Sequence, residues 1–98
     1  MIYTIDQIRS IATPIARAYG VKSLSLFGSY ARGEATESSD IDLLVDCGAI
    51  RSAFQMGGLY ADLSESLGKE LDLVTTDHRD KDFLGRIQRD QRRLYTNN

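Results

Sequence analysis

The fold is decided by residues 26–46, which read LFGSYARGEATESSDIDLLVD. Apolar and polar side chains alternate from Val21 to Phe27, and this period of two predicts a strand. Gly28 and Ser29 interrupt the alternation, and a short helical turn is predicted over residues 30–33. Such a turn directs backbone N–H groups, and the Ser29 hydroxyl, at whatever lies in front of it. This chemistry suits a phosphate, although a single Gly-Ser turn is more often structural.

Carboxylates occupy one face of the strand predicted over residues 40–46, which follows a short polar loop. Asp40 and Asp42 share this face, whereas the odd-numbered positions of the strand are apolar. Asp72 projects from a third strand, predicted over residues 70–75. If these two strands are neighbours, about 4.8 Å apart, the three carboxylates converge.

Converging carboxylates need a cation, because two of them about 5 Å apart repel by about 3 kcal/mol at an effective dielectric constant of ~20. Oxygen ligands suit Mg²⁺, and two Mg²⁺ ions bridged by carboxylates drive phosphoryl and nucleotidyl transfer. The plain alternative is that Asp40 and Asp42 are solvent-facing strand residues beside a loop. The Gly-Ser turn, the polar loop at residues 34–39 and the carboxylate pair together favour the metal site, because the combination is more specific than any one part.

Three helices complete the predicted fold. A capping box that starts at Thr4 begins a helix over about residues 5–19, kinked or restarted at Pro14. Apolar residues at helical spacing predict a second long helix over about residues 51–67, and a last helix covers about residues 80–89. This order of elements predicts an α/β (α+β) domain with a three-stranded sheet and helices on one face.

The motifs resemble those of the minimal nucleotidyltransferases (MNT) of the DNA polymerase beta superfamily. Their pattern is G-S-x-x-R-G, a short spacer, S-D-x-D followed by apolar residues, and a third aspartate in the next strand. Here it reads GSYARG at residues 28–33, SDIDLLV at residues 39–45 and ELDLV at residues 70–74, with no departure at any motif position. The resemblance implies a polymerase-beta-type nucleotidyltransferase fold, with a small mixed sheet of three to four strands and helices mainly on one face. It also implies a single catalytic domain over residues 1–98.

An activity follows from the same resemblance. Known members of this kind are antitoxins encoded beside a HEPN-domain ribonuclease toxin, and they transfer AMP from ATP to a tyrosine of that toxin. By this resemblance Asp40 and Asp42 bind both Mg²⁺ ions, and Asp72 completes one metal site. Asp72 is also the implied base for the acceptor hydroxyl. A hetero-oligomer with a HEPN toxin from the neighbouring gene is therefore expected.

The Gly-Ser turn takes the nucleotide-binding role in this resemblance. Gly28 and Ser29 would hold the outgoing pyrophosphate of ATP. Arg32 either contacts a phosphate or pairs with Glu34 or Glu37 to fix the loop. Nothing in the motif reads the base, so modest base selectivity is expected, and ATP is implied by the resemblance alone.

Composition favours a cytoplasmic globular protein and argues against other classes. The chain has 98 residues, of which 42% are hydrophobic and 27% charged, as in one small domain. A net charge of −2 argues against direct DNA binding through phosphates, and no apolar run approaches the roughly 20 residues that span a bilayer. The first ten residues lack the basic-then-apolar pattern of a signal segment, and the single Cys47 cannot form an internal disulfide.

Residues outside the motifs have plainer interpretations. His78, the lone histidine, is interpreted as a surface residue, and Cys47 lacks the histidine partner of a nucleophile. Tyr30 and Tyr60 either stack on adenine or belong to the core. A basic stretch near the end of the chain is a solvated helix face, a docking site for an acidic partner or an RNA contact. It comprises Arg86, Arg89, Arg92 and Arg93.

Two other functions remain open from the sequence. One is a non-catalytic nucleotide-binding module that neutralises a partner toxin by steric contact. The other is the catalytic subunit of an enzyme that modifies a small molecule. Three converging carboxylates favour catalysis over pure binding, and 98 residues leave no room for the additional acceptor-binding domain of the small-molecule enzymes.

Overall fold

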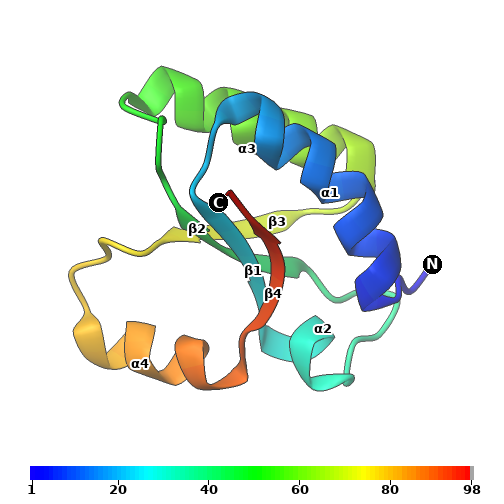
Figure 1. Cartoon of the computed structure of the whole chain (residues 1–98). Coiled ribbons are helices and arrows are strands. Elements are labelled where there is room, and N and C mark those ends of the chain that lie inside the picture. Colours follow the sequence, from blue (N-terminus) through cyan, green and yellow to red (C-terminus); the bar gives the residue numbers. More distant parts are fainter. Residues whose placement is uncertain (98) are drawn as a thin grey trace.

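Helices cover both faces of one mixed sheet (Figure 1). The computed structural model describes residues 1–97. In chain order the elements are α1 (Ile5–Tyr19), β1 (Ser23–Phe27), α2 (Gly28–Arg32), β2 (Ile41–Asp46), α3 (Ala53–Leu67), β3 (Leu71–Thr75), α4 (Lys81–Asp90) and β4 (Arg92–Thr96). The strand order is β3-β2-β1-β4, with β1 antiparallel to both β2 and β4, and β2 parallel to β3. No helix within residues 1–97 is long and apolar enough to cross a membrane.

The first helix begins and ends as its sequence predicts. The Thr4 hydroxyl accepts from the Gln7 N–H at 3.1 Å, and the Gln7 side chain accepts from the Thr4 N–H at 2.8 Å. Gly20 ends the helix in the left-handed conformation, with φ 71°. The helix runs through Pro14 without a restart. Proline leaves the carbonyl of Ser10 without its helical partner, and both residues are exposed, so water can satisfy that carbonyl.

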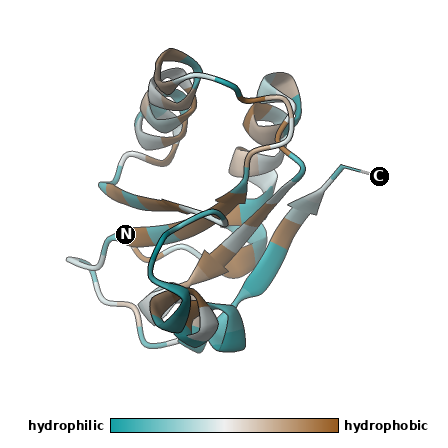
Figure 2. Cartoon of the chain, turned by 90° about the vertical axis from the view of Figure 1, so that its left-hand side faces the viewer, coloured by the Kyte–Doolittle hydropathy of each residue, from teal (hydrophilic) through white to brown (hydrophobic). Residues whose placement is uncertain are grey.

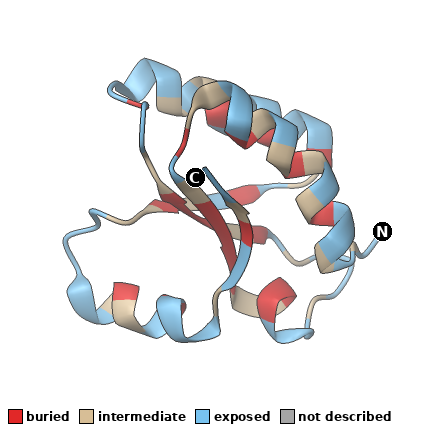
Figure 3. Ribbon diagram, in the orientation of Figure 1, coloured by how far each residue is buried: buried red, intermediate tan, exposed pale blue. Residues whose placement is uncertain are grey.

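The main core lies between the sheet and the two long helices. α1 and α3 pack side by side on one face (Figure 1), and buried residues concentrate on the strands and on the helix sides that face them (Figure 3). Hydrophobic residues are prominent along the strands (Figure 2). The fully buried large side chains of this core include Ile8, Leu24, Leu26, Ile41, Leu43, Leu59 and Leu63.

The last helix, α4, lies on the opposite face. A second apolar cluster forms there, made of Phe27, Leu44, Val74, Leu84 and Ile87. Alternation along β2 places Leu44 on the same face as Asp42, so the middle of this face is apolar and needs a cover. The predicted α/β fold class is confirmed, and within it the prediction of helices mainly on one face holds for α1 and α3 but not for α4.

The segment around Leu94 and Tyr95, to which the periodicity assigns no element, forms the edge strand β4. The sheet therefore has four strands, one more than the alternating patterns predict and within the range of three to four that the resemblance implies. Its pairing with β1 shifts register between Leu24 and Ser25, and the Nε of Arg93 donates to the buried Ser25 hydroxyl at 3.0 Å. A short strand that begins with arginines and pairs through a bulge has no alternating pattern that the sequence could show.

Candidate active site

Asp42 and Asp72 lie opposite each other on neighbouring parallel strands. The register of β2 and β3 pairs these two residues directly. Side chains at paired positions point to the same face of a sheet, and parallel neighbours are about 4.8 Å apart. Asp42 is half-buried, whereas Asp72 is exposed. The condition on which the predicted convergence depends, adjacency of the two strands, is therefore met.

Burial and the charges of neighbouring carboxylates raise the pKa of Asp42. Its pKa is raised from 3.8 to about 6, first by burial, then by the charge of Asp72 and then by that of Asp40. Arg32 acts in the opposite direction and lowers this pKa. Asp40 itself is exposed and directly precedes β2. The charges of Asp72 and Asp40 thus act on the Asp42 carboxylate, and a cation bound between these side chains would relieve the repulsion.

These carboxylates fit a magnesium–nucleotide complex better than a bare metal ion. Within residues 1–97, no three histidine, cysteine or acidic side chains are arranged to hold a metal ion by themselves. Mg²⁺ is usually bound by one or two carboxylates together with substrate phosphates, and it keeps several waters. Asp42 and Asp72 supply such a pair of oxygen ligands on one face. The donor set and the repulsion at Asp42 therefore fit Mg²⁺ that arrives with a triphosphate.

Gly28 makes the close approach of Asp42 possible. A Cβ atom at this position would lie 2.1 Å from Oδ2 of Asp42, and the backbone has a φ of +72°. Both observations require glycine here. Phe27, which precedes α2, provides no side-chain cap for its first N–H groups, and Ser29 is half-buried beside them. The Gly-Ser turn and the Asp-x-Asp strand are thus one packed unit.

Arg32 is bound by acidic side chains at the end of α2. Its Nε donates to Oε1 of Glu34 at 2.8 Å, and one terminal nitrogen lies 3.5 Å from Oδ2 of Asp90 in α4. The predicted pairing with Glu34 is confirmed. Glu37, the other predicted partner, instead contacts the amino group of Met1. Arg32 therefore links α2 to the following loop and to α4, beside the carboxylates.

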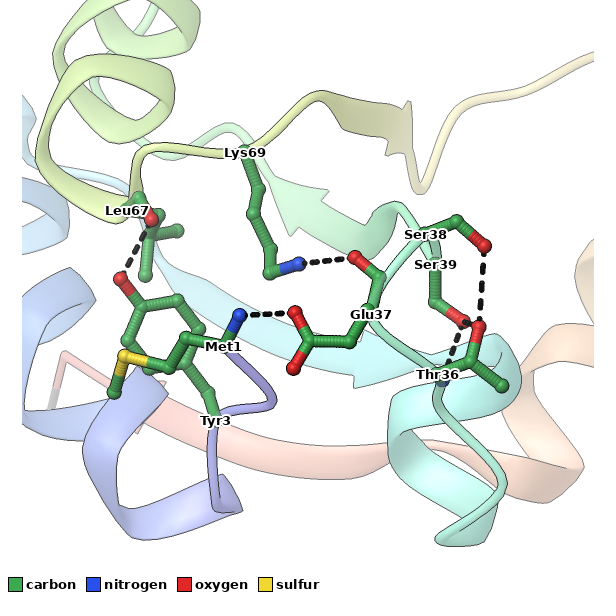
Figure 4. Close-up of polar contacts among 8 residues, drawn as sticks. All are labelled: Met1, Tyr3, Thr36, Glu37, Ser38, Ser39, Leu67 and Lys69. Atoms are coloured by element: carbon green, nitrogen blue, oxygen red, sulfur yellow. Dashed lines mark hydrogen bonds and ion pairs between the residues drawn. The ribbon is translucent and has the colours of Figure 1, made fainter.

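The loop before Asp40 is tied to the rest of the fold (Figure 4). The Thr36 N–H donates to the Ser39 hydroxyl at 2.8 Å, and the Thr36 and Ser38 hydroxyls are 3.2 Å apart. Nζ of Lys69 donates to the backbone carbonyl of Glu37 at 3.0 Å. The sequence motifs do not mark Lys69. The only feature of the sequence that could have pointed to Lys69 is its position, as a basic residue between Gly68, which ends α3, and the strand that carries Asp72.

The two tyrosines that could stack on adenine have structural positions. Tyr30 belongs to the main core, and its buried hydroxyl has no hydrogen-bond partner among the described residues. The Tyr60 hydroxyl donates to the carbonyl of Leu71 at 3.4 Å, which links α3 to β3. The core assignment is therefore confirmed for Tyr30, whereas it is wrong for Tyr60, whose side chain is exposed.

His78 and Cys47 also behave as structural residues. Nδ1 of His78 accepts from the Asp80 N–H at 3.1 Å, and its ring lies 5.2 Å from that of Phe83. Burial raises the pKa of the Cys47 thiol, and so do the nearby charges of Asp77 and Asp46, which opposes thiolate formation. Neither residue has the environment of a catalytic group.

All four arginines of the basic stretch are exposed, and one of them, Arg93, is also hydrogen-bonded to other side chains. Arg93 is bound to the hydroxyls of Ser25 and Thr96, at 3.0 and 2.9 Å, so its side chain belongs to the sheet. Arg86, Arg89 and Arg92 are exposed. No ion pair involves these three within the described part of the chain. Arg86 and Arg89 lie on α4, as a solvated helix face requires, whereas Arg92 begins β4.

Curated relatives of this chain are adenylyltransferases by name. A Methanocaldococcus jannaschii protein, named provisionally as a protein adenylyltransferase, is 46% identical over 71 residues, which are 72% of this chain and 76% of its own length. The protein adenylyltransferase MntA of Thermococcus cleftensis is 41% identical over 75 residues, with the same two coverages of 72% and 76%.

Solved structures share the fold at lower identity. One of them is the complex of a tri-AMPylated Shewanella oneidensis HEPN toxin with an MNT antitoxin. It matches with a TM-score of 0.72 and 18% identity, over 95% of this chain and 73% of the matched chain. The family described as "Polymerase beta, Nucleotidyltransferase" matches residues 10–98. The chain therefore belongs to the polymerase beta nucleotidyltransferase family, among its minimal nucleotidyltransferases, as the Gly-Ser and Asp-x-Asp motifs predicted.

Proposed function

We propose that this chain is a protein adenylyltransferase that moves AMP from ATP to a tyrosine hydroxyl of a HEPN toxin and thereby acts as its antitoxin. The observation that carries the proposal is the pairing of Asp42 with Asp72, closed on one side by Gly28. Relatives more than 40% identical are named for protein adenylylation, and the fold is that of an MNT antitoxin. The reaction would use two Mg²⁺ ions and take place in the cytoplasm, where ATP is available.

The carboxylates have distinct roles in this proposal. Asp40 and Asp42 would hold both metal ions, and Asp72 would complete one of the two sites. Two-metal sites stabilise the attacking and the leaving oxygen of an in-line displacement, and this is the chemistry that the ions supply. Asp72 is exposed, so it can also take the proton from an incoming hydroxyl. The raised pKa of Asp42 reflects the repulsion that bound cations would remove.

Nucleotide binding falls to the turn between β1 and α2. The N–H groups at Gly28 and Ser29 lack a side-chain cap and are the groups that we assign to the pyrophosphate half of ATP. Arg32 lies close enough to lower the pKa of Asp42, so its charge acts on the same place. We assign Arg32 primarily to holding the loop through Glu34, with phosphate contact as its alternative role.

The acceptor would approach from solvent. Asp40 and Asp72 are exposed at the end of the sheet, so a residue on a docked protein can reach them. The tyrosine oxygen would form a bond to the α-phosphorus as the bond to the β-phosphate oxygen breaks. Pyrophosphate leaves, and the hydroxyl proton passes to Asp72. The product, a tyrosine with an added anionic group, would obstruct RNA binding by the toxin.

Isotope position distinguishes this reaction from its alternatives. The chain is incubated with the HEPN protein encoded beside it, Mg²⁺ and ATP labelled on either the α- or the γ-phosphate. Label on the HEPN protein from α-labelled ATP alone supports adenylyl transfer. Label from γ-labelled ATP would indicate phosphorylation, and an inhibited but unlabelled HEPN protein would favour steric neutralisation.

A further inference from the structure

We infer that Lys69 is a positioning residue that fixes Asp40 relative to Asp72. The expected consequence for metal binding rests on the proposed function. Lys69 lies in the short connection between α3 and β3, two residues before β3 begins. Its Nζ donates to the backbone carbonyl of Glu37 at 3.0 Å, in the loop that leads to Asp40 (Figure 4).

Two consecutive residues, Lys69 and Glu70, hold the two ends of the segment formed by residues 37–41, which contains Asp40. Lys69 binds the carbonyl of Glu37 through its side chain, and the carbonyl of Glu70 accepts from the Ile41 N–H at 3.1 Å. Asp40 lies between these two attachment points. The next strand residues after Glu70 lead directly to Asp72. The two carboxylates are therefore connected through a hydrogen-bonded frame that is only a few residues long.

The base of the Lys69 side chain is itself fixed. The Ser64 hydroxyl donates to the carbonyl of Lys69 at 3.1 Å, and the Gly68 N–H donates to the carbonyl of Ser64 at 2.8 Å. The Tyr3 hydroxyl donates to the carbonyl of Leu67 at 2.6 Å. These contacts occupy carbonyls at the end of α3 that a lysine often caps. The Lys69 ammonium instead reaches across to the loop, from a half-buried position.

Asp40 depends on this frame more than Asp42 does. Asp42 is half-buried within β2 and packs against Gly28, so both β2 and the start of α2 hold it in place. Asp40 is exposed and precedes the first residue of β2. Its position therefore follows the backbone of the loop, and the loop carbonyl bound by Lys69 is three residues away.

Hydrogen exchange tests the attachment without any requirement for activity. Loss of one hydrogen bond of about 1 kcal/mol predicts about fivefold faster exchange of the amides of residues 36–41 in Lys69→Met. Lys69→Arg, which can still donate to the carbonyl, is expected to restore the rate. Lys22→Met removes a lysine that is exposed and distant in the sequence and serves as the control for loss of a lysine charge, and Glu37→Ala keeps the carbonyl that Lys69 binds. Unchanged exchange in Lys69→Met would overturn the attachment.

Affinity for Mn²⁺ in the presence of a non-hydrolysable ATP analogue tests the consequence. Residues that orient a metal ligand typically change affinity by about tenfold or more, so we expect a tenfold loss in Lys69→Met, with rescue by Lys69→Arg. Faster exchange with unchanged Mn²⁺ affinity would overturn the positioning role. A wild-type chain that binds no Mn²⁺–nucleotide at all would refute the proposed function, whereas the exchange rates would still decide the attachment.

Discussion

Oδ2 of Asp42 occupies the space in which any other residue at the position of Gly28 would place its side chain, 2.1 Å from an ideal Cβ atom. The Gly-Ser turn therefore does more than approach a phosphate. It also leaves room for the Asp42 carboxylate beside the start of α2.

Gly28→Ala is expected to lower both stability and nucleotide binding. Gly33→Ala is the matched control, because Gly33 has a similar φ of +75° but, among residues 1–97, no atom within 4 Å of its ideal Cβ position. The control should lose about 1–2 kcal/mol from left-handed strain alone. Gly28→Ala should lose more than the control in urea unfolding and should bind Mg²⁺–ATP at least tenfold more weakly. Equal losses in the two variants would contradict the close contact.

Asp42→Asn is expected to stabilise the metal-free protein above pH 6. The pKa of Asp42 is about 6 in the folded state against 3.8 ordinarily, so the folded state binds more protons between these values. The free energy of unfolding therefore falls as the pH rises from about 4 to 6, and allowing for the screening of a half-buried group the loss is about 1–2 kcal/mol.

This linkage is measured by urea unfolding of both proteins in EDTA across that pH range. The advantage of Asp42→Asn should shrink toward about pH 4, where the wild-type carboxyl is protonated. An advantage that is independent of pH would show that repulsion and burial of the charge are not its cause.

Mg²⁺ and ATP together should stabilise the chain far more than ATP alone. A triphosphate without cations meets the charges of Asp40, Asp42 and Asp72, whereas the magnesium complex neutralises them. At a concentration about 100 times its Kd, the complex would add about 2.7 kcal/mol to the free energy of unfolding. Thermal melts with ATP, Mg²⁺ or both are the measurement. Equal shifts with ATP in the presence and absence of Mg²⁺ would contradict a metal site.

Arg32→Gln and Glu34→Gln separate the two roles of the arginine. The pair is exposed, so either change should alter stability by less than about 1 kcal/mol. If Arg32 acts by fixing the loop, the two variants should weaken Mg²⁺–ATP binding to the same small extent in calorimetry. A large loss in Arg32→Gln alone would show that the guanidinium contacts a phosphate.

Local patterns were sufficient for most of the fold and for the predicted site. The capping box at Thr4, the alternation in β2 and the helical spacing in α3 each concern a few neighbouring residues, and all are confirmed. The alternation also predicted that Asp72 lies near Asp40 and Asp42 if the two strands are neighbours; the strands are neighbours, and their register pairs Asp42 with Asp72.

Features that depend on contacts between distant segments could not be predicted from local sequence patterns. The apolar patch around Leu44 determines which face α4 covers, and that patch is assembled from three strands. The pairing of β4 depends on a bulge opposite β1. Lys69 contacts a backbone carbonyl, and a carbonyl carries no side-chain signature. In each case the partner is defined by the fold and has no fixed spacing along the chain.

The intact mass of the HEPN toxin that we propose as the partner of this chain is the most direct test of the central claim. After incubation with this chain, ATP and Mg²⁺, that protein should gain one or more AMP units, and its ribonuclease activity should fall in parallel. Asp42→Asn and Asp72→Asn should produce no gain, whereas the surface control Lys22→Met should behave as wild type. A HEPN protein that is inhibited with unchanged mass would contradict adenylyl transfer and assign the chain a purely steric role.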